Sequence, residues 1–347
     1  MTHDGSKDSS VGVVVQYLEN ISKEYQFEYI KKDETNAVRK QGIVGNFISF
    51  FIKKPFHLAT AAYVLQDNIF LPMAYLHFPK AVKIIQLWHG TGTIKKFGQS
   101  VNTGRLGKLE KRANQTITHL LVNSEYTKKQ YKEAFGVSED KIKVLGLPRT
   151  DIMFQEDKKA RDLEEFYHRF PDLKEKKLVL YAPTFRDNEV NNPKIMLDVN
   201  LFIEQTPEEY VLILKLHPFV AAAFQLDTKQ YQGRVMNLST YGDLNTLLFA
   251  ADILVTDYSS IIFEYCLLDK PMIFYAYDLD QFSDMGRGFY ESYEDYVPGP
   301  VVKNTLELSS IIRSNCYDLL KIRQFRVKSY EYLDGQSTKR LVEKIIL

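Results

Sequence analysis

The sequence predicts an α/β protein with two domains, each built around a parallel sheet. Short apolar segments alternate along the chain with charged, helix-like segments, a pattern typical of strand–helix–strand units. The 347 residues suffice for two ordinary domains. The pattern breaks at Gly146-Leu147-Pro148-Arg149, which favours a boundary there. We therefore expect domains at 1–149 and 150–325, and a C-terminal helix at 326–347 that packs back toward the first domain.

In the first domain, four apolar runs are interpreted as strands: 11–17, 82–87, 119–123 and 142–145. Ser124 is expected to cap a helix that ends near Phe135-Gly136. Residues 41–66 are apolar and aromatic around Lys53 and Lys54. Two interpretations of this segment stay open: a pair of core helices, or an amphipathic segment that rests on a bilayer.

In the second domain, strands are expected at 178–181, 210–216, 253–255 and 271–277. The third of these leads into a polar turn, Thr256-Asp257-Tyr258, and then a helix that opens on Ser259 and Ser260. The N terminus of a helix offers free backbone N–H groups and the positive end of the helix dipole. This turn is therefore a candidate phosphate site, with ordinary serine capping as the alternative.

Polar residues recur where the predicted strands end. His89 follows a strand of the first domain, and Arg186 and His217 follow two strands of the second. Ligands bind at the carboxyl ends of strands in open α/β sheets, so we expect these residues and the turn at Asp257 to line one cleft. His89 lies in a glycine-rich loop and can accept a proton near neutral pH. Arg186 suits an anionic oxygen, although a surface salt bridge is an equal alternative.

Two further groups of residues are candidates for contacts with a nucleotide. Glu264 lies one helical turn beyond the serines, where its carboxylate could accept hydrogen bonds from ribose hydroxyls. Tyr277, Tyr290 and Tyr293 could stack on a base or a sugar. There is no G-x-G-x-x-G fingerprint, which argues against a nicotinamide-dependent enzyme.

The net charge of +1 hides an asymmetry between the two halves of the chain. Residues 1–150 carry 22 lysines and arginines against 13 acidic residues, a net charge of +9, and the remainder carries −8. The first half is therefore expected to face something anionic: nucleic acid, a membrane or a phosphorylated acceptor.

Cys266 and Cys316 are interpreted as buried free thiols. Without a transmembrane run or a signal peptide core, the sequence favours an intracellular protein.

Eight segments in fixed order resemble a known family. They are QLWHGTGTIKKFG, NSEYTKKQYKEAFG, VLGLPRTD, VLYAPTFRD, LKLHP, ADILVTDYSSIIFEY, KPMIFYAYDLDQF and RGFY. Together, from about residue 86 to residue 334, they resemble the CDP-glycerol:glycerophosphotransferases of wall teichoic acid synthesis. The resemblance implies a GT-B fold, that is, two Rossmann-like domains with a cleft between them. It also implies a peripheral membrane enzyme that transfers glycerol phosphate or ribitol phosphate from a CDP-alditol to a lipid-linked acceptor.

The resemblance also implies roles for individual residues. His89 would be the base on the acceptor hydroxyl, and His217 would hold or neutralise the donor phosphate. The donor would be bound by Thr184, Arg186, Ser259 and Ser260, with Asp257 ordering their loop and Glu264 meeting the ribose. The sequence does not require a metal, because arginine, histidine and a helix N terminus could neutralise the phosphates. Magnesium stays open as an alternative.

The short stretch before the first motif resembles the priming members of the family. Such an enzyme would add glycerol 3-phosphate to an undecaprenyl-diphosphate-linked ManNAc-GlcNAc acceptor at the cytoplasmic face of the membrane and release CMP. The basic segment 95–112 and residues 41–66 would then face the anionic membrane. The alternatives are a polymerising glycerol- or ribitol-phosphate transferase and a GT-B glycosyltransferase that uses a nucleotide sugar. A nucleic-acid binder is disfavoured because the second half is acidic and no nucleic-acid motif occurs.

Overall fold

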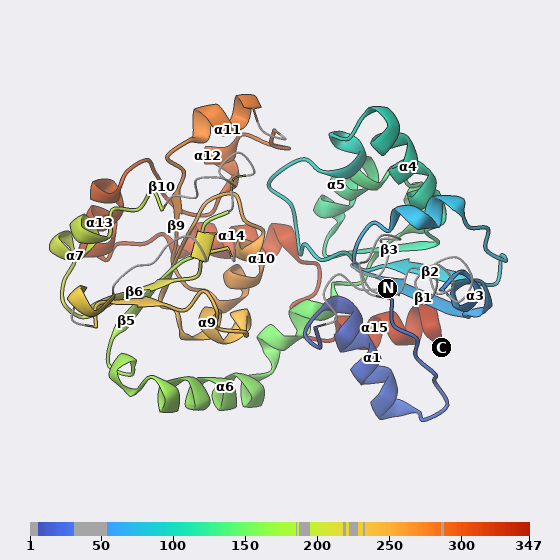
Figure 1. Ribbon diagram of the computed structural model, residues 1–347, viewed down its shortest axis with the longest axis horizontal. Coiled ribbons are helices and arrows are strands. Elements are labelled where there is room, and N and C mark those ends of the chain that lie inside the picture. Colours follow the sequence, from blue (N-terminus) through green and yellow to red (C-terminus); the bar gives the residue numbers. More distant parts are fainter. Residues whose placement is uncertain are drawn as a thin grey trace, which may run out of the picture. The chain divides into compact units, whose positions relative to one another are not determined.

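The chain divides into two units (Figure 1). Unit 1 comprises Met1–Phe154 and Lys328–Leu347, and unit 2 comprises Gln155–Val327. These limits lie close to the predicted boundaries after residues 149 and 325. The computed structural model describes residues 6–30, 54–184, 186, 195–217, 220–221, 228–231, 233–285 and 288–347.

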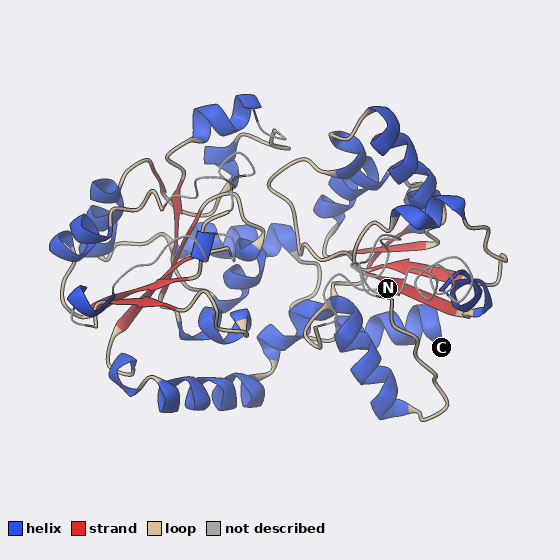
Figure 2. Ribbon diagram, in the orientation of Figure 1, coloured by secondary structure: helices blue, strands red, loops and turns tan. Residues whose placement is uncertain are grey.

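The described part of unit 1 is built on a parallel sheet with the strand order β1-β2-β3-β4. Strands are drawn in red in Figure 2. The strands are β1 (Tyr63–Gln66), β2 (Lys83–Gln86), β3 (His119–Val122) and β4 (Ile142–Val144). The last three confirm predicted strands. β1 falls inside 41–66, where no strand was predicted, and the part of that segment from 41 to 53 lies outside the described residues.

Helices cover both faces of this sheet, which is why its central strands are apolar. The helical segments are α1 (Ser10–Ile21), α3 (Lys54–Thr60), η3 (Leu71–Tyr75), η4 (Gly98–Ser100), α4 (Gly104–Gln115), α5 (Glu125–Phe135), η5 (Glu139–Lys141), η6 (Pro148–Phe154), α15 (Ser337–Leu341) and η11 (Val342–Ile346). On one face Ile85 and Leu121 pack with α1 and α15. On the other, Leu120 and Val122 pack with α5.

The strand predicted at 11–17 is wrong, because these residues form helix α1. Its buried positions Val11, Val14, Val15 and Leu18 follow the helical period and pack against the C-terminal residues. The hydroxyl of Ser9 caps the helix by accepting a hydrogen bond from Gly12 N at 3.0 Å. The run of valines favours a strand locally, but the amphipathic spacing decides the outcome.

The C-terminal segment is fastened within unit 1 by a buried carboxylate. Asp151 accepts hydrogen bonds from the backbone N–H groups of Ser337 and Thr338, at 2.9 and 2.8 Å. It also accepts a bond from the Thr338 hydroxyl at 2.7 Å. The carboxylate thus satisfies donors at the start of α15 that the helix itself leaves unpaired. The single helix expected at 326–347 is wrong, because α14 spans Leu319–Ser329 and a new helical segment begins at Ser337, but residues 328–347 do belong to the first unit.

The described part of unit 2 is built on a parallel sheet with the strand order β10-β9-β8-β5-β6-β7. The strands are β5 (Lys177–Tyr181), β6 (Tyr210–Leu214), β7 (Val235–Asn237), β8 (Ile253–Thr256), β9 (Met272–Tyr275) and β10 (Val301–Val302). The chain builds β5, β6 and β7 toward one edge, then returns to place β8 on the other side of β5. The strand order therefore reverses between β5 and β8, the switch point at which doubly wound sheets bind ligands.

The four strands predicted in this half are confirmed as β5, β6, β8 and β9, whereas the short β7 and β10 were not predicted. The helical segments are α6 (Glu156–Arg169), η7 (Pro171–Leu173), α7 (Val199–Gln205), η9 (Thr228–Tyr231), α9 (Leu244–Ala250), α10 (Ile261–Tyr265), η10 (Cys266–Leu268), α11 (Leu279–Met285), α12 (Tyr293–Tyr296), α13 (Thr305–Ser314) and α14 (Leu319–Ser329). Side chains of the sheet pack against α7 and α13 to form the core.

The two cysteines have different surroundings. Cys266 is buried, as predicted, and burial raises the pKa of its thiol. The prediction that Cys316 is buried is wrong: it follows the end of α13 at Asn315 and is exposed. Across the residues that the structure describes, no helix combines the length and the apolar character needed to cross a membrane.

Candidate functional site

The carboxyl ends of β5 and β8 meet at the switch point of the unit 2 sheet. Ala182, just beyond β5, donates its N–H to Val255 O at 2.9 Å, and the Thr256 hydroxyl donates to Ala182 O at 2.7 Å. These bonds hold the two strand ends in register as they leave the sheet. The segment with Arg186 and the turn with Asp257 are therefore brought together, as the sequence pattern predicts for strand ends.

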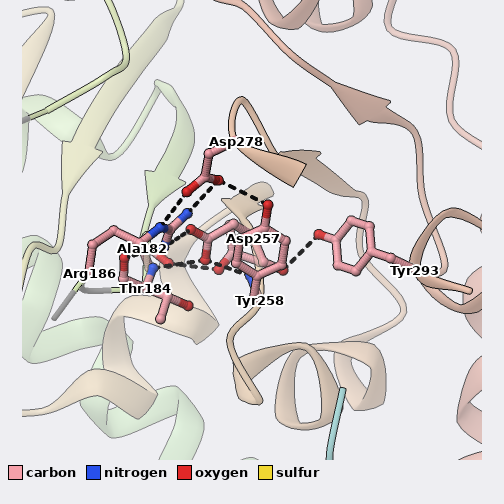
Figure 3. Close-up of polar contacts among 8 residues, drawn as sticks. Ala182, Thr184, Arg186, Asp257, Tyr258, Asp278 and Tyr293 are labelled. Carbon is pink, nitrogen blue, oxygen red and sulfur yellow. Dashed lines mark hydrogen bonds and ion pairs between the residues drawn. The ribbon is translucent and has the colours of Figure 1, made fainter. Parts of the chain in front are cut away.

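Asp257 is the centre of this site and is 1% exposed. Its Oδ1 accepts the backbone N–H groups of Thr184, at 2.8 Å, and Tyr258, at 2.6 Å. Its Oδ2 lies 2.9 Å from Nη1 of Arg186, and its backbone oxygen accepts the Tyr293 hydroxyl at 3.0 Å (Figure 3). The carboxylate thus ties the loop after β8 to the loop after β5.

Arg186 is enclosed by groups of its own unit and is 7% exposed. Its Nε and Nη2 donate to the two carboxylate oxygens of Asp278 at 2.8 and 2.9 Å, and its Nη1 donates to Thr184 O at 2.6 Å. Aromatic rings approach the guanidinium to within 5.5 Å, from Tyr258, Tyr277 and Phe282. Burial alone would lower the pKa of Arg186, but its hydrogen bond to Asp278 and the charge of Asp257 raise that pKa overall. The side chain therefore stays charged.

Asp278 is a site residue that our sequence reasoning missed. It lies three residues beyond the end of β9, and besides Arg186 it accepts the Tyr258 hydroxyl at 2.9 Å. Burial and the neighbouring charge of Asp278 raise the pKa of Tyr258, which keeps this hydroxyl protonated and able to donate. The signal was present, because Asp278 is an acidic residue just after an apolar strand, the same position that drew attention to Asp257.

The helix predicted to open on the two serines begins slightly later, at Ile261. Ser260 is the N-cap residue, but its side chain makes no capping hydrogen bond, and the Ser259 hydroxyl accepts the Ile261 N–H at 3.4 Å. Both serines are partly exposed beside the Asp257 turn. Glu264 lies on α10 and is only 5% exposed, a burial that limits its access to a ribose. Its assignment to the ribose stays a prediction.

His217 and the three tyrosines have different surroundings. His217 follows β6, the neighbour of β5 in the sheet, and its side chain is exposed. Tyr277 lies beside Arg186, whereas Tyr293 is buried against Tyr258 with a ring-centroid distance of 5.1 Å. Tyr290 is partly exposed. Their contacts with a ligand stay predictions.

In unit 1, His89 follows β2 and presents an exposed side chain. Its Nδ1 lies 2.9 Å from the backbone oxygen of Asp67. Because a carbonyl oxygen can only accept, Nδ1 carries the proton in this contact. The basic lone pair of the neutral ring then belongs to Nε2, the arrangement that a general base needs.

The loop that carries His89 is fixed by contacts along its length. Trp88 has a left-handed backbone (φ 53°), its N–H donates to Gln86 Oε1 at 2.9 Å, and its ring stacks on Phe97 at 5.1 Å. The Tyr131 hydroxyl donates to Gly90 O at 2.7 Å. In addition, the Asn123 side chain donates to Thr91 O, and Arg149 donates to the His89 carbonyl. The imidazole is therefore held on a rigid loop.

A family model and several curated teichoic acid proteins match this chain. The family described as CDP-Glycerol:Poly(glycerophosphate) glycerophosphotransferase matches residues 3–347. The teichoic acid poly(ribitol-phosphate) polymerase of Bacillus spizizenii is 35% identical over 95% of this chain, which spans only 53% of that polymerase. The teichoic acid glycerol-phosphate primase of Bacillus subtilis is 34% identical over 84% of this chain and 77% of its own length.

A solved structure shares the fold of this chain. A variant of the wall teichoic acid polymerase TagF superposes with a TM-score of 0.78 at 21% identity, covering 99% of this chain and 86% of that chain. Together with the two parallel α/β units described above, this likeness confirms the predicted GT-B fold.

Proposed function

The chain belongs to the CDP-glycerol:poly(glycerophosphate) glycerophosphotransferase family, and we propose that it transfers glycerol 3-phosphate from CDP-glycerol to a lipid-linked acceptor. The acceptor would be the undecaprenyl-diphosphate-linked ManNAc-GlcNAc disaccharide, and the reaction would prime wall teichoic acid synthesis. The family match over residues 3–347 carries the proposal, and the likeness to a glycerol-phosphate primase supports the priming step.

Unit 2 binds the donor in this proposal. The turn after β8 offers the partly exposed hydroxyls of Ser259 and Ser260 at the switch point, where nucleotides bind in doubly wound sheets. Thr184 contributes from the loop after β5, and its buried Oγ1 has no hydrogen-bond partner among the described residues. His217, beyond β6, would neutralise phosphate charge. Together these groups would hold the diphosphate of CDP-glycerol.

Unit 1 supplies the base. Nε2 of His89 takes the proton from the acceptor hydroxyl while that oxygen attacks the β-phosphorus of CDP-glycerol. A bond forms between the acceptor oxygen and the β-phosphorus, the bond from this phosphorus to the bridging oxygen breaks, and CMP leaves. Such a transfer depends on positioning and charge neutralisation rather than on a covalent intermediate. The proposal includes no resident metal, with magnesium as the alternative.

The likeness to a poly(ribitol-phosphate) polymerase favours a second candidate function, repeated transfer of alditol phosphate. Incubation with CDP-glycerol and a synthetic lipid-linked disaccharide, followed by mass spectrometry of the product, separates the two. We expect CMP release and a product with one added glycerol phosphate. A ladder of additions, or turnover of CDP-ribitol alone, would favour the polymerase. Release of UDP from a UDP-sugar instead would identify a nucleotide-sugar transferase and overturn the proposal.

A membrane-facing surface on unit 1 forms part of the proposal. We define it as the exposed face of α4 and η3, with Arg105, Lys108, Lys111, Arg112, Leu106 and Tyr75. Leu106 and Tyr75 are 46% and 60% exposed, and no aspartate or glutamate occurs from residue 68 to residue 109. Glu110, on the same helix, is buried and accepts a hydrogen bond from Asn102. Exposed cations with interspersed apolar side chains suit an anionic bilayer surface.

We expect co-sedimentation with liposomes to increase with their content of anionic lipid. Replacing Arg105, Lys108 and Lys111 together by glutamine should weaken this binding roughly 100-fold, since each basic residue near the surface adds about 1 kcal/mol. A matched control replaces Lys128, Lys129 and Lys132 of α5, where Lys128 and Lys132 lie within 3.6 Å of Glu139. Binding that ignores lipid charge, or that falls equally in both variants, would contradict the membrane-facing assignment.

A further inference from the structure

Asp278 lies outside the proposed catalytic scheme, yet it makes the most extensive contacts with Arg186. The two side chains form a bidentate pair at 2.8 and 2.9 Å, the geometry in which a guanidinium binds a carboxylate most specifically. The Tyr258 hydroxyl adds a third hydrogen bond to the same carboxylate at 2.9 Å. Asp278 therefore connects the end of β9 both to the loop after β5 and to the turn after β8.

We propose that Asp278 is a positioning residue for the donor diphosphate. It fixes the guanidinium of Arg186, which forms an ion pair with Oδ2 of Asp257, while Oδ1 of Asp257 accepts hydrogen bonds from the N–H groups of Thr184 and Tyr258. Through this chain of contacts, Asp278 sets the shape of the two loops that would surround the phosphates. Arg186 then acts through Asp257 and does not itself bind the phosphates. The inference rests on the proposed function of unit 2 as the donor-binding unit.

The contacts of Arg186 support this division of roles. Its Nε, Nη1 and Nη2 all donate to groups of unit 2, and rings from Tyr258, Tyr277 and Phe282 surround its guanidinium. Turning it toward a phosphate would break its pair with Asp278 and leave that carboxylate without its cation. Losing one partner of a buried pair is costly, because the remaining charge is uncompensated.

The charges of these residues provide a test, because the two possible roles of Arg186 predict opposite changes in donor affinity. Asp257, Asp278 and Arg186 together carry one negative charge, which repels a diphosphate. If Arg186 were the direct phosphate ligand, neutralising Asp278 would release the guanidinium and tighten donor binding. If Asp278 is a positioning residue, the same change loosens the loops and weakens donor binding, even though it removes a repulsive charge. The sign of the change in affinity therefore decides between the two roles.

The experiment compares Asp278→Asn with Asp280→Asn, a control two residues further along the chain, whose carboxylate is 89% exposed and lies 3.6 Å from Nζ of Lys303. Calorimetric titration with CDP-glycerol should show affinity weakened about tenfold or more in Asp278→Asn and unchanged in Asp280→Asn. The KM for CDP-glycerol should rise, with the KM for the lipid acceptor unchanged. Affinity that is unchanged or tighter in Asp278→Asn would overturn the inference.

Three further measurements keep the test independent of folding and of the proposed reaction. Tyr258→Phe removes only the hydroxyl that bonds to Asp278, and it should weaken CDP-glycerol binding in the same direction. The double variant Arg186→Lys with Asp278→Asn should lose no more affinity than the worse single variant, whereas additive losses would contradict a shared role. Inorganic pyrophosphate is the second probe. If pyrophosphate binding depends on Asp278 even though the wild type does not bind CDP-glycerol, CDP-glycerol is not the donor, but Asp278 still positions a diphosphate site.

Discussion

Replacing His89 by asparagine is expected to lower the transfer rate by about 10²–10⁴-fold, the usual contribution of a general base. The Asn side chain can still donate to the Asp67 carbonyl, as Nδ1 of His89 does at 2.9 Å, so the loop should keep its conformation. What it cannot supply is the basic lone pair of Nε2. Because the donor is assigned to unit 2, the affinity for CDP-glycerol should stay within about twofold.

Single-turnover rates with the lipid-linked acceptor and calorimetric titration with CDP-glycerol measure the two quantities separately. His168→Asn is the matched control, because His168 is an exposed histidine at the end of α6 and should leave both unchanged. His89→Ala should lose transfer in the same way, although it also removes the contact with Asp67. If donor affinity falls in parallel with the transfer rate in His89→Asn, His89 is a donor-binding residue and the assignment of the base is wrong.

The sheet of each unit was largely predictable, because a buried parallel strand needs apolar residues on both faces. That requirement produces a clear run of apolar residues in the sequence, such as 210–216, which contains β6. The strand predicted at 11–17 was wrong. The valines at 11, 13, 14 and 15 suit a strand locally, yet this segment forms a helix that packs against the C-terminal residues of the chain. The apolar spacing of this segment fits a helix, but the C-terminal residues that it packs against are too distant in sequence to be inferred from it.

The site residues that could be predicted are those that follow an apolar strand, because ligands bind at the carboxyl ends of strands. Arg186 and Asp257 were identified because each follows an apolar strand, and the structure joins them across the switch point at 2.9 Å. The second partner of Arg186, Asp278, was not identified: it follows the apolar strand β9, but Asp280 lies only two residues further on. Only the direction in which the chain leaves the sheet selects Asp278 for the guanidinium.

Replacing Asp257 by asparagine should have the second large effect, on donor binding and on stability together. The new amide oxygen can still accept the N–H groups of Thr184 and Tyr258, but the amide nitrogen would meet the Arg186 guanidinium, donor against donor. We expect a loss of about 1–3 kcal/mol in the free energy of unfolding. Displacement of the phosphate-binding loops should also weaken CDP-glycerol binding roughly 100-fold.

Asp252→Asn provides a matched control at the opposite end of the same strands, because Asp252 accepts the Leu178 N–H at 2.7 Å where β5 and β8 begin. Urea denaturation and calorimetric titration with CDP-glycerol should separate the two variants: only Asp257→Asn should lose donor affinity. If both variants lost affinity in proportion to stability, the carboxylate of Asp257 would merely hold the sheet together. If neither lost affinity, the donor would bind away from the switch point. If only Asp257→Asn loses affinity for CDP-glycerol, the carboxyl ends of β5 and β8 shape the donor site.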